Sequence, residues 1–114
     1  MSTPSPAADL RAAAQLLLDL ADAADEDLAT NPYWRSEYHP PEHWFANGID
    51  NACGGPAGQL ARMFNPATAR ALADTFRAWA RMGDMDADLL HRIGGEDTIA
   101  VARQLLATAK EFTR

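Results

Sequence analysis

Residues 65–82 read NPATARALADTFRAWARM, and this stretch carries the plainest helical pattern in the chain. Asn65 is suited to cap a helix, and Pro66 fits its first turn, where a missing N–H costs nothing. Apolar side chains recur at helical spacing on one face, at Ala69, Leu72, Ala73, Phe76, Trp79 and Ala80. A second face is basic and holds Arg70, Arg77 and Arg81. The stretch predicts a long helix that ends near Met82, with Gly83 as its left-handed C-terminal residue.

Two further long helices are predicted on either side of this one. The first runs from Pro6 to about Leu28 with Ser5 as its cap. Its apolar stripe holds Leu10, Ala13, Ala14, Leu17, Ala21, Ala24 and Leu28, widened by Leu16, Leu18 and Leu20. That stripe is wider than one core contact needs, so we expect a second neighbour, either the middle segment or another subunit in a homodimer. The last helix starts around Glu96–Thr98, and its stripe holds Ile99, Val101, Ala102, Leu105, Leu106, Ala109 and Phe112.

Residues 31–58 interrupt the helical period with prolines and glycines and hold most of the aromatic side chains. We expect an ordered, irregular segment, in which Asn47-Gly48 is typical of a type I′ hairpin turn. Short helices are predicted from Pro56 to about Phe64 and from an Asp84 cap to Gly94-Gly95.

The sequence therefore predicts a mainly α fold. Three long helices and several short ones surround one core, and the irregular aromatic middle segment, which could contain a short β-hairpin, lies across it. Residues 1–6 are expected to form a flexible leader and residues 7–114 a single helical domain. The core residues expected are Leu17, Leu20, Leu72, Phe76, Trp79, Leu105 and Phe112.

Composition excludes several classes of protein. The formal net charge of −6 argues against binding to a phosphate backbone, so no direct nucleic-acid binding is expected. A single cysteine excludes an internal disulfide and fits a reducing compartment. There is no apolar run long enough for a membrane span and no secretory leader. We expect a protein of the cytoplasm that makes no contact with a membrane.

No residue pattern indicates catalysis, a metal or a cofactor. His39 and His43 have a spacing that binds zinc only on a helix, and Pro40-Pro41 forbids that helix. Cys53 has no motif around it that supplies an oxyanion donor. The acidic run at Asp84, Asp86 and Asp88 lacks the glycine and the final glutamate of a calcium loop. We expect no enzyme, no catalytic residues, no metal site and no cofactor.

The aromatic segment is the strongest candidate for a binding surface. Its candidate partner-binding residues are Trp34, Arg35, Tyr38, His39, His43 and Trp44. Tryptophan, tyrosine and arginine are the residue types that dominate protein-interaction hot spots. The competing interpretation, favoured for most of these rings, is that they supply core volume that alanine-rich helices lack.

The first helix also carries an acidic face made of Asp19, Asp22, Asp25 and Glu26. Such a face can mimic a nucleic-acid backbone. It can equally be a solvated helix surface, or pair with Arg70, Arg77 and Arg81 within a subunit or across a dimer.

Three motifs occur in the order found in one known family. Residues 30–34 (TNPYW) follow the first helix, residues 60–74 read LARMFNPATARALAD, and residues 98–106 read TIAVARQLL. Together they resemble the Ead-like early-region proteins of phages and prophages, especially those of high-GC actinobacterial hosts. The resemblance implies a phage origin and no particular reaction, and it would place the protein in the cytoplasm of the bacterial host.

The leading functional hypothesis is a non-enzymatic phage accessory protein that binds a host or phage protein, as a modulator of host metabolism or defence. Two alternatives remain open. One is an acidic mimic that blocks a DNA- or RNA-binding host factor, and the other is a small-ligand sponge with the aromatic segment as its pocket wall.

Overall fold

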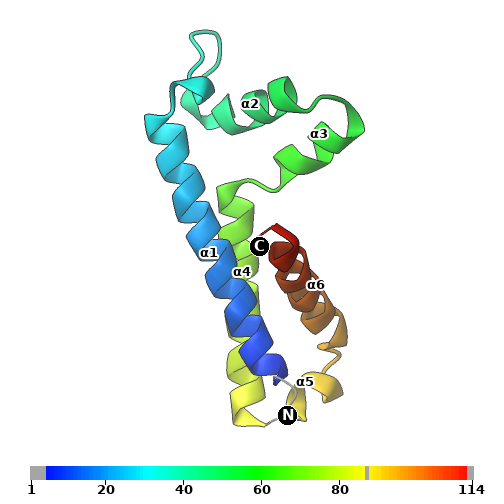
Figure 1. Cartoon of the computed structure of the whole chain (residues 1–114). Helices are drawn as coiled ribbons and strands as arrows, with labels where there is room; N and C mark the ends of the chain where they lie inside the picture. Colours follow the sequence, from blue (N-terminus) through cyan, green and yellow to red (C-terminus); the bar gives the residue numbers. More distant parts are fainter. Residues whose placement is uncertain (1–4, 87, 113–114) are drawn as a thin grey trace. The chain divides into compact units, whose positions relative to one another are not determined.

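A computed structural model describes residues 5–86 and 88–112 of the chain, and for Phe112 it describes the backbone alone. The elements in order are α1 (Pro6–Thr30), η1 (Pro32–Trp34), η2 (Pro41–His43), α2 (Trp44–Ala52), α3 (Gly55–Met63), α4 (Pro66–Met85), α5 (Leu89–Arg92) and α6 (Glu96–Phe112). Figure 1 shows these elements along the chain. The mainly α prediction with three long helices is confirmed, and the described residues contain no strand.

The chain divides into two compact units. Unit 1 comprises Met1–Leu18 together with Arg70–Arg114, and unit 2 comprises Asp19–Ala69. The long helices α1 and α4 contribute residues to both. Residues 1–4 of the predicted leader lie outside the described part, and α1 begins at Pro6 with the Ser5 hydroxyl accepting a hydrogen bond from the Ala8 amide at 3.1 Å.

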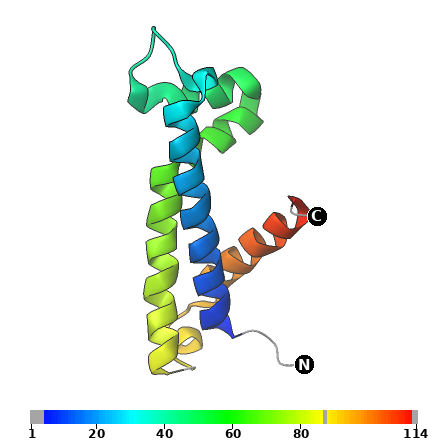
Figure 2. The same cartoon turned by 60° about the vertical axis from the view of Figure 1, so that its left-hand side comes forward.

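The interior of unit 1 is built largely from small side chains. Its buried residues are Leu10, Ala13, Ala14, Leu17, Ala73, Phe76, Ala80, Leu90, Ile99 and Ala102. Within this unit α1 runs beside α4, and α6 crosses them at an angle (Figures 1 and 2). Alanines at a helix contact let the two backbones approach closely, because the interaxial distance depends on the side chains between them. Phe76 is fully buried and supplies the largest ring of this interior.

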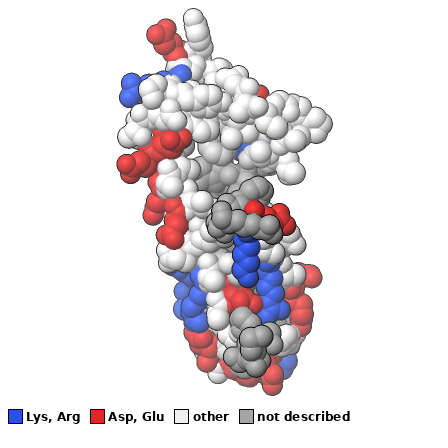
Figure 3. All heavy atoms as spheres, viewed as in Figure 1, with Lys and Arg blue, Asp and Glu red and all other residues white. Residues whose placement is uncertain are grey.

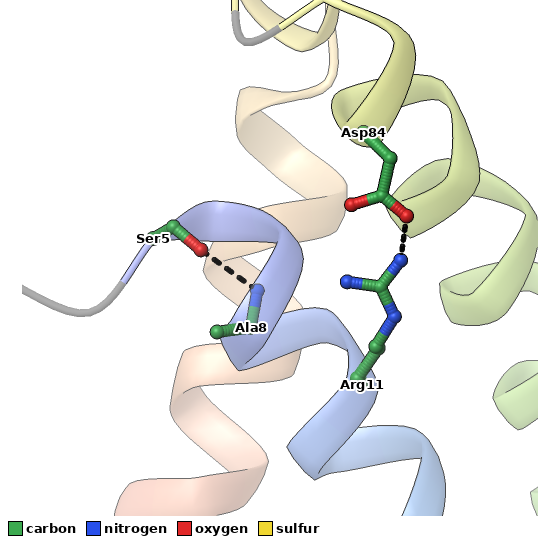
Figure 4. A network of polar contacts seen from close by, with 4 residues as sticks. All are labelled: Ser5, Ala8, Arg11 and Asp84. Carbon is green, nitrogen blue, oxygen red and sulfur yellow. Dashed lines mark hydrogen bonds and ion pairs between the residues drawn. The ribbon is translucent and has the colours of Figure 1, made fainter.

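Two ion pairs fix the position of α1 within unit 1. Arg11 pairs with Asp84 of α4, and the Arg103 Nε of α6 lies 2.8 Å from an Asp9 carboxylate oxygen. Figure 4 shows Arg11 reaching from α1 to Asp84. The predictions for this end of α4 were wrong: α4 continues to Met85, so Gly83 is not a left-handed terminus and Asp84 does not cap the next helix. The physical reason is that Gly83 lies where α4 approaches its neighbours, with the nearest atoms belonging to Leu90 and Ala7.

The predicted core is confirmed in part. Leu17 and Phe76 are buried, and Leu72, Trp79 and Leu105 are half-buried. The prediction was wrong for Leu20, which is 57% exposed, and Val101 of the last stripe is also exposed. In each helix the buried residue is instead the next one in sequence, about 100° further round the helix. It is Ala21 after Leu20 and Ala102 after Val101. The side chain of Phe112 lies outside the described residues.

The predicted hairpin at Asn47-Gly48 was also wrong. Both residues lie inside α2, and Gly48 is buried. Among the described residues only Gly55 and Gly94 have positive φ, so Gly48 is not a turn glycine. In unit 2, α2 and α3 pack against each other, and η1 and η2 pack against α2. Within residues 31–58 the longest stretch outside a helix is residues 35–40, between η1 and η2, and Figure 2 shows it as a loop extending from the helices of this unit.

Candidate functional site

Trp34 connects α1, η1 and α2 within unit 2. Its indole Nε1 donates a hydrogen bond to an Asp27 carboxylate oxygen at 2.6 Å. Its ring stacks on Phe45, with centroids 5.9 Å apart and planes at 9°, and meets the Tyr33 ring edge-on at 5.0 Å. Because the ring is half-buried and held on three sides, Trp34 serves mainly to organise the fold of this unit.

Gly48 of α2 provides the space that Trp34 occupies. A Cβ at this position would overlap the Trp34 ring and come within 3.3 Å of the Tyr33 ring. The Tyr33 hydroxyl also donates a hydrogen bond to the Gly48 carbonyl oxygen at 2.6 Å. The glycine of the pair that suggested a hairpin therefore lies inside α2, where its missing side chain makes room for the Trp34 ring.

The remaining predicted partner-binding residues divide by exposure. The Trp44 ring is half-buried and donates its Nε1 hydrogen bond to the His39 carbonyl oxygen at 3.0 Å. Arg35, His39 and His43 are exposed, and Tyr38 is 90% exposed near the tip of the loop. The structure thus places the two tryptophans in the framework of unit 2 and displays the other four side chains to solvent.

A second exposed surface in unit 2 was missed by the sequence analysis. Leu60 is 76% exposed, Met63 is 70% exposed and Phe64 is 42% exposed. Spacings of three and four residues place them on one side of α3 and its C-terminal cap. We call these three residues the α3 ridge. Single exposed apolar residues are ordinary, whereas adjacent large ones form a candidate interaction surface.

The surroundings of the α3 ridge are nearly free of charge. Between Asn51 and Ala69 the only charged residue is Arg62, in a chain that is 23% charged overall. Figure 3 shows the uncharged surface over α2 and α3 as a continuous white area. Depletion of charge is typical of the centre of a protein interface. The low charge of this stretch can be read from the sequence, whereas the exposure of its large apolar side chains is visible only in the structure.

The α3 ridge is carried by a well-fixed helix. The guanidinium of Arg62 pairs with the Asp50 carboxylate of α2 at 2.6 Å. A Cβ at Gly58 would overlap the carbonyl oxygen of Cys53, so α3 approaches the end of α2 as closely as a backbone can. A ridge held this way loses little conformational freedom when a partner binds.

The predicted acidic face lies on α1. Asp19, Asp22, Asp25 and Glu26 are all exposed. The first three each already have an interaction partner, so the face is not a set of free carboxylates.

The residues considered for catalysis and metal binding do not converge. Cys53 is exposed, and its thiol makes no hydrogen bond with another described residue. Among residues 5–86 and 88–112, no three side chains of histidine, cysteine, aspartate or glutamate come together as metal ligands. The structure contributes no geometry for a reaction at these positions.

One carboxylate has a shifted pKa. A hydrogen bond from its own backbone N–H lowers the pKa of Glu96 below 4.5, and the His91 side chain, 3.1 Å from its Oε1, acts in the same direction. Glu96 begins α6, where a negative charge is favoured by the helix dipole. The shift is explained by helix capping and needs no functional role.

Comparisons with known proteins identify no relative. No protein-family model matches the chain, and no curated protein or solved structure matches it either. Within the described residues, no helix is long and apolar enough to cross a membrane.

Proposed function

We propose that this chain is a non-enzymatic accessory protein that binds another protein through unit 2. The observation that carries the proposal is the α3 ridge, three large apolar side chains exposed within a surface almost without charge. Complete burial of one such side chain stabilises a complex by about 1.5–3 kcal/mol. The early-region phage proteins that the sequence resembles suggest a host or phage protein as the partner.

The occupant we propose is an apolar groove on a different protein. The α3 ridge lies along one side of a helix, and apolar side chains on a helix face bind in an apolar groove. Neither hollow described in unit 1 is such a groove. One is lined by Arg11, Gln15, Arg77 and Arg81, and the other holds the charged Asp9, Arg103 and Lys110 beside Leu106 and Ala107. A second copy of this chain would therefore have to pair ridge against ridge.

The loop residues Arg35, Tyr38, His39 and His43 form a second candidate element of the same surface. They are exposed, and they are attached to a framework fixed by Trp34 and Trp44. Loops held by a rigid scaffold commonly supply specificity, because their side chains vary without disturbing the fold. We assign the apolar contact to α3 and the selection of partner to this loop.

Site-specific photocrosslinking tests the proposal. A photoreactive amino acid replaces Met63 in one sample and Met85 in another, since Met85 is equally apolar, 81% exposed and located in unit 1. We expect position 63 to crosslink to one host or phage protein and position 85 to give no such product. A product that consists only of two copies of this chain, or equal crosslinking from both positions, would contradict the proposal.

A further inference from the structure

Three arginines from two helices of unit 1 surround one hollow on its surface. Arg77 and Arg81 lie one turn apart on α4, and Arg11 and Gln15 lie one turn apart on α1. Together they line a hollow of about 270 Å³. We call these four residues the arginine hollow. Since all four belong to unit 1, the hollow is separate from the α3 ridge.

The relative position of the two helices accounts for this convergence. Arg11 pairs with Asp84, and the neighbouring Gly83 lies in van der Waals reach of α1, since an added Cβ would lie 3.4 Å from the Ala7 methyl group. The two helices run antiparallel. Gln15, one turn after Arg11 on α1, therefore lies level with the residues one turn before Asp84 on α4. Gln15 consequently lies beside the arginines of α4 at the hollow. Figure 4 shows the Arg11–Asp84 pair that joins the two helices next to it.

The charge of the arginine hollow is not balanced by its neighbours. Arg77 and Arg81 repel each other at a spacing of one turn, and neither makes an ion pair or hydrogen bond with another described residue. Asp84 pairs with Arg11, and Asp74 lies one turn before Arg77 on α4, so the three guanidinium groups are set against two nearby carboxylates. One positive charge remains in excess. The net charge of −6 on the whole chain does not cancel it, because charges beyond about 8 Å are largely screened at physiological salt.

We propose that the arginine hollow binds a phosphate or phosphate monoester dianion. Three guanidinium groups line the hollow, and guanidinium groups donate paired hydrogen bonds that fit phosphate oxygens. Donors converging from two helices suit a tetrahedral group better than a planar carboxylate. The volume is below the range of pockets that enclose drug-sized ligands, so the ligand is a single phosphoryl group with at most a small organic part.

Titration of the full chain with three probes tests this site. Inorganic phosphate, ribose 5-phosphate and chloride are added at matched ionic strength, and amide NMR shifts of residues 11–15 and 77–81 are followed. We expect saturable shifts with either phosphate and none with chloride. Tighter binding of ribose 5-phosphate would assign the site to organic monoesters, and equal binding would assign it to free phosphate; both results support a phosphate site.

Variants locate the site and exclude a structural explanation. Arg77→Gln and Arg81→Gln should each weaken phosphate binding about tenfold, the usual effect of losing one charge-assisted hydrogen bond. Lys110→Gln removes the same charge from the exposed surface of α6 and should leave binding unchanged. Circular dichroism checks that each variant remains folded. The titration of the wild-type chain tests phosphate binding on its own, because it requires no substitution that could disturb the fold.

Three results would overturn the proposal. The first is an absence of saturable shifts with either phosphate. The second is equal weakening by Lys110→Gln and by the two arginine variants, which would indicate a nonspecific charge effect. The third is a wild-type dimer in light scattering that Arg77→Gln converts to a monomer, because the hollow would then hold the acidic surface of a second copy.

Discussion

The indole nitrogen of Trp34 lies 2.6 Å from a carboxylate oxygen of Asp27, and this hydrogen bond joins the end of α1 to η1. The same ring stacks on Phe45 and fills the space above Gly48. One aromatic side chain thereby connects three successive elements of unit 2. The exposed loop and the α3 ridge depend on this arrangement for their positions.

Loss of the Asp27 carboxylate should destabilise unit 2. Asp27→Ala removes the acceptor of the Trp34 N–H and of the longer hydrogen bonds from the Asn31 side-chain amide, at an expected cost of about 1 kcal/mol. Urea unfolding followed by tryptophan fluorescence measures the effect. The control is Glu26→Ala, because Glu26 is also exposed and acidic but no hydrogen bond or ion pair of its side chain occurs among the described residues. Equal stability of the two variants would show that the indole hydrogen bond contributes nothing.

Substitution of Gly48 sets two effects against each other. Alanine is favoured over glycine in a helix by up to about 1 kcal/mol, so propensity alone predicts that Gly48→Ala stabilises α2. The added Cβ overlaps the Trp34 ring, however, and that ring is fixed by Asp27 and Phe45. We expect the cost of this overlap to exceed the gain in helix propensity, with a net loss of about 1–3 kcal/mol in the free energy of unfolding.

Gly54→Ala is a control for an added Cβ that meets no ring. The nearest atom to its added Cβ is a backbone oxygen of Asp50 at 3.7 Å, an ordinary contact. Gly54 is the N-cap of α3, where alanine is less favourable than glycine, so its effect should stay within about 1 kcal/mol. A Gly48→Ala variant as stable as the wild type in the same urea titration would mean that the Trp34 ring can move aside.

Close packing in unit 1 predicts a large difference between two nearby alanines. Ala73 is fully buried on α4, and Ala71 is exposed two residues earlier. Leucine at position 73 should destabilise the protein by about 1–3 kcal/mol through overpacking, whereas leucine at position 71 should have little effect. Thermal unfolding of Ala73→Leu and Ala71→Leu checks this, and equal melting temperatures would show that the contact can open to admit a larger side chain.

The lowered pKa of Glu96 predicts a pH dependence of stability. A carboxyl whose pKa is lower in the folded state contributes stability above its unfolded value, and that contribution is lost as the pH falls through the folded value. Glu96→Gln should therefore flatten the acid side of the stability profile below 4.5, the ordinary pKa of this group. Urea midpoints measured from neutral to acid pH test it, with Glu111→Gln of the same helix as control. Profiles for Glu96→Gln and wild type that run parallel would contradict the assignment.

Local signals predicted most of the fold correctly. Asn65 caps α4 as expected, with its side-chain oxygen 2.9 Å from the Thr68 amide nitrogen. Ser5 caps α1 in the same way. Such caps involve residues three or four apart, so they can be read from the sequence without knowledge of tertiary contacts.

Features that depend on tertiary contacts could not be predicted. Asn47-Gly48 has the composition of a hairpin turn, and only the Trp34 ring, fourteen residues from Gly48 in sequence, explains why glycine stands in a helix. The sequence grouped Arg77 and Arg81 with Arg70, whereas their common hollow with Arg11 requires the register of α1 against α4. The exposure of Leu60 and Met63 likewise depends on which side of α3 packs on α2.

Protein binding by the α3 ridge is tested by quantitative capture from a lysate of the proposed actinobacterial host, with three immobilised forms of the full chain. The forms are wild type, Leu60→Ser/Met63→Ser and Met85→Ser. All three substituted side chains are highly exposed, so each variant should fold with stability close to that of the wild type, as checked by circular dichroism.

We expect wild type and Met85→Ser to capture the same protein in equal amount. The double variant should bind it about a hundredfold more weakly, the equivalent of about 2.7 kcal/mol. Capture of that protein by all three forms in equal amount would contradict the assignment of the α3 ridge as the contact surface.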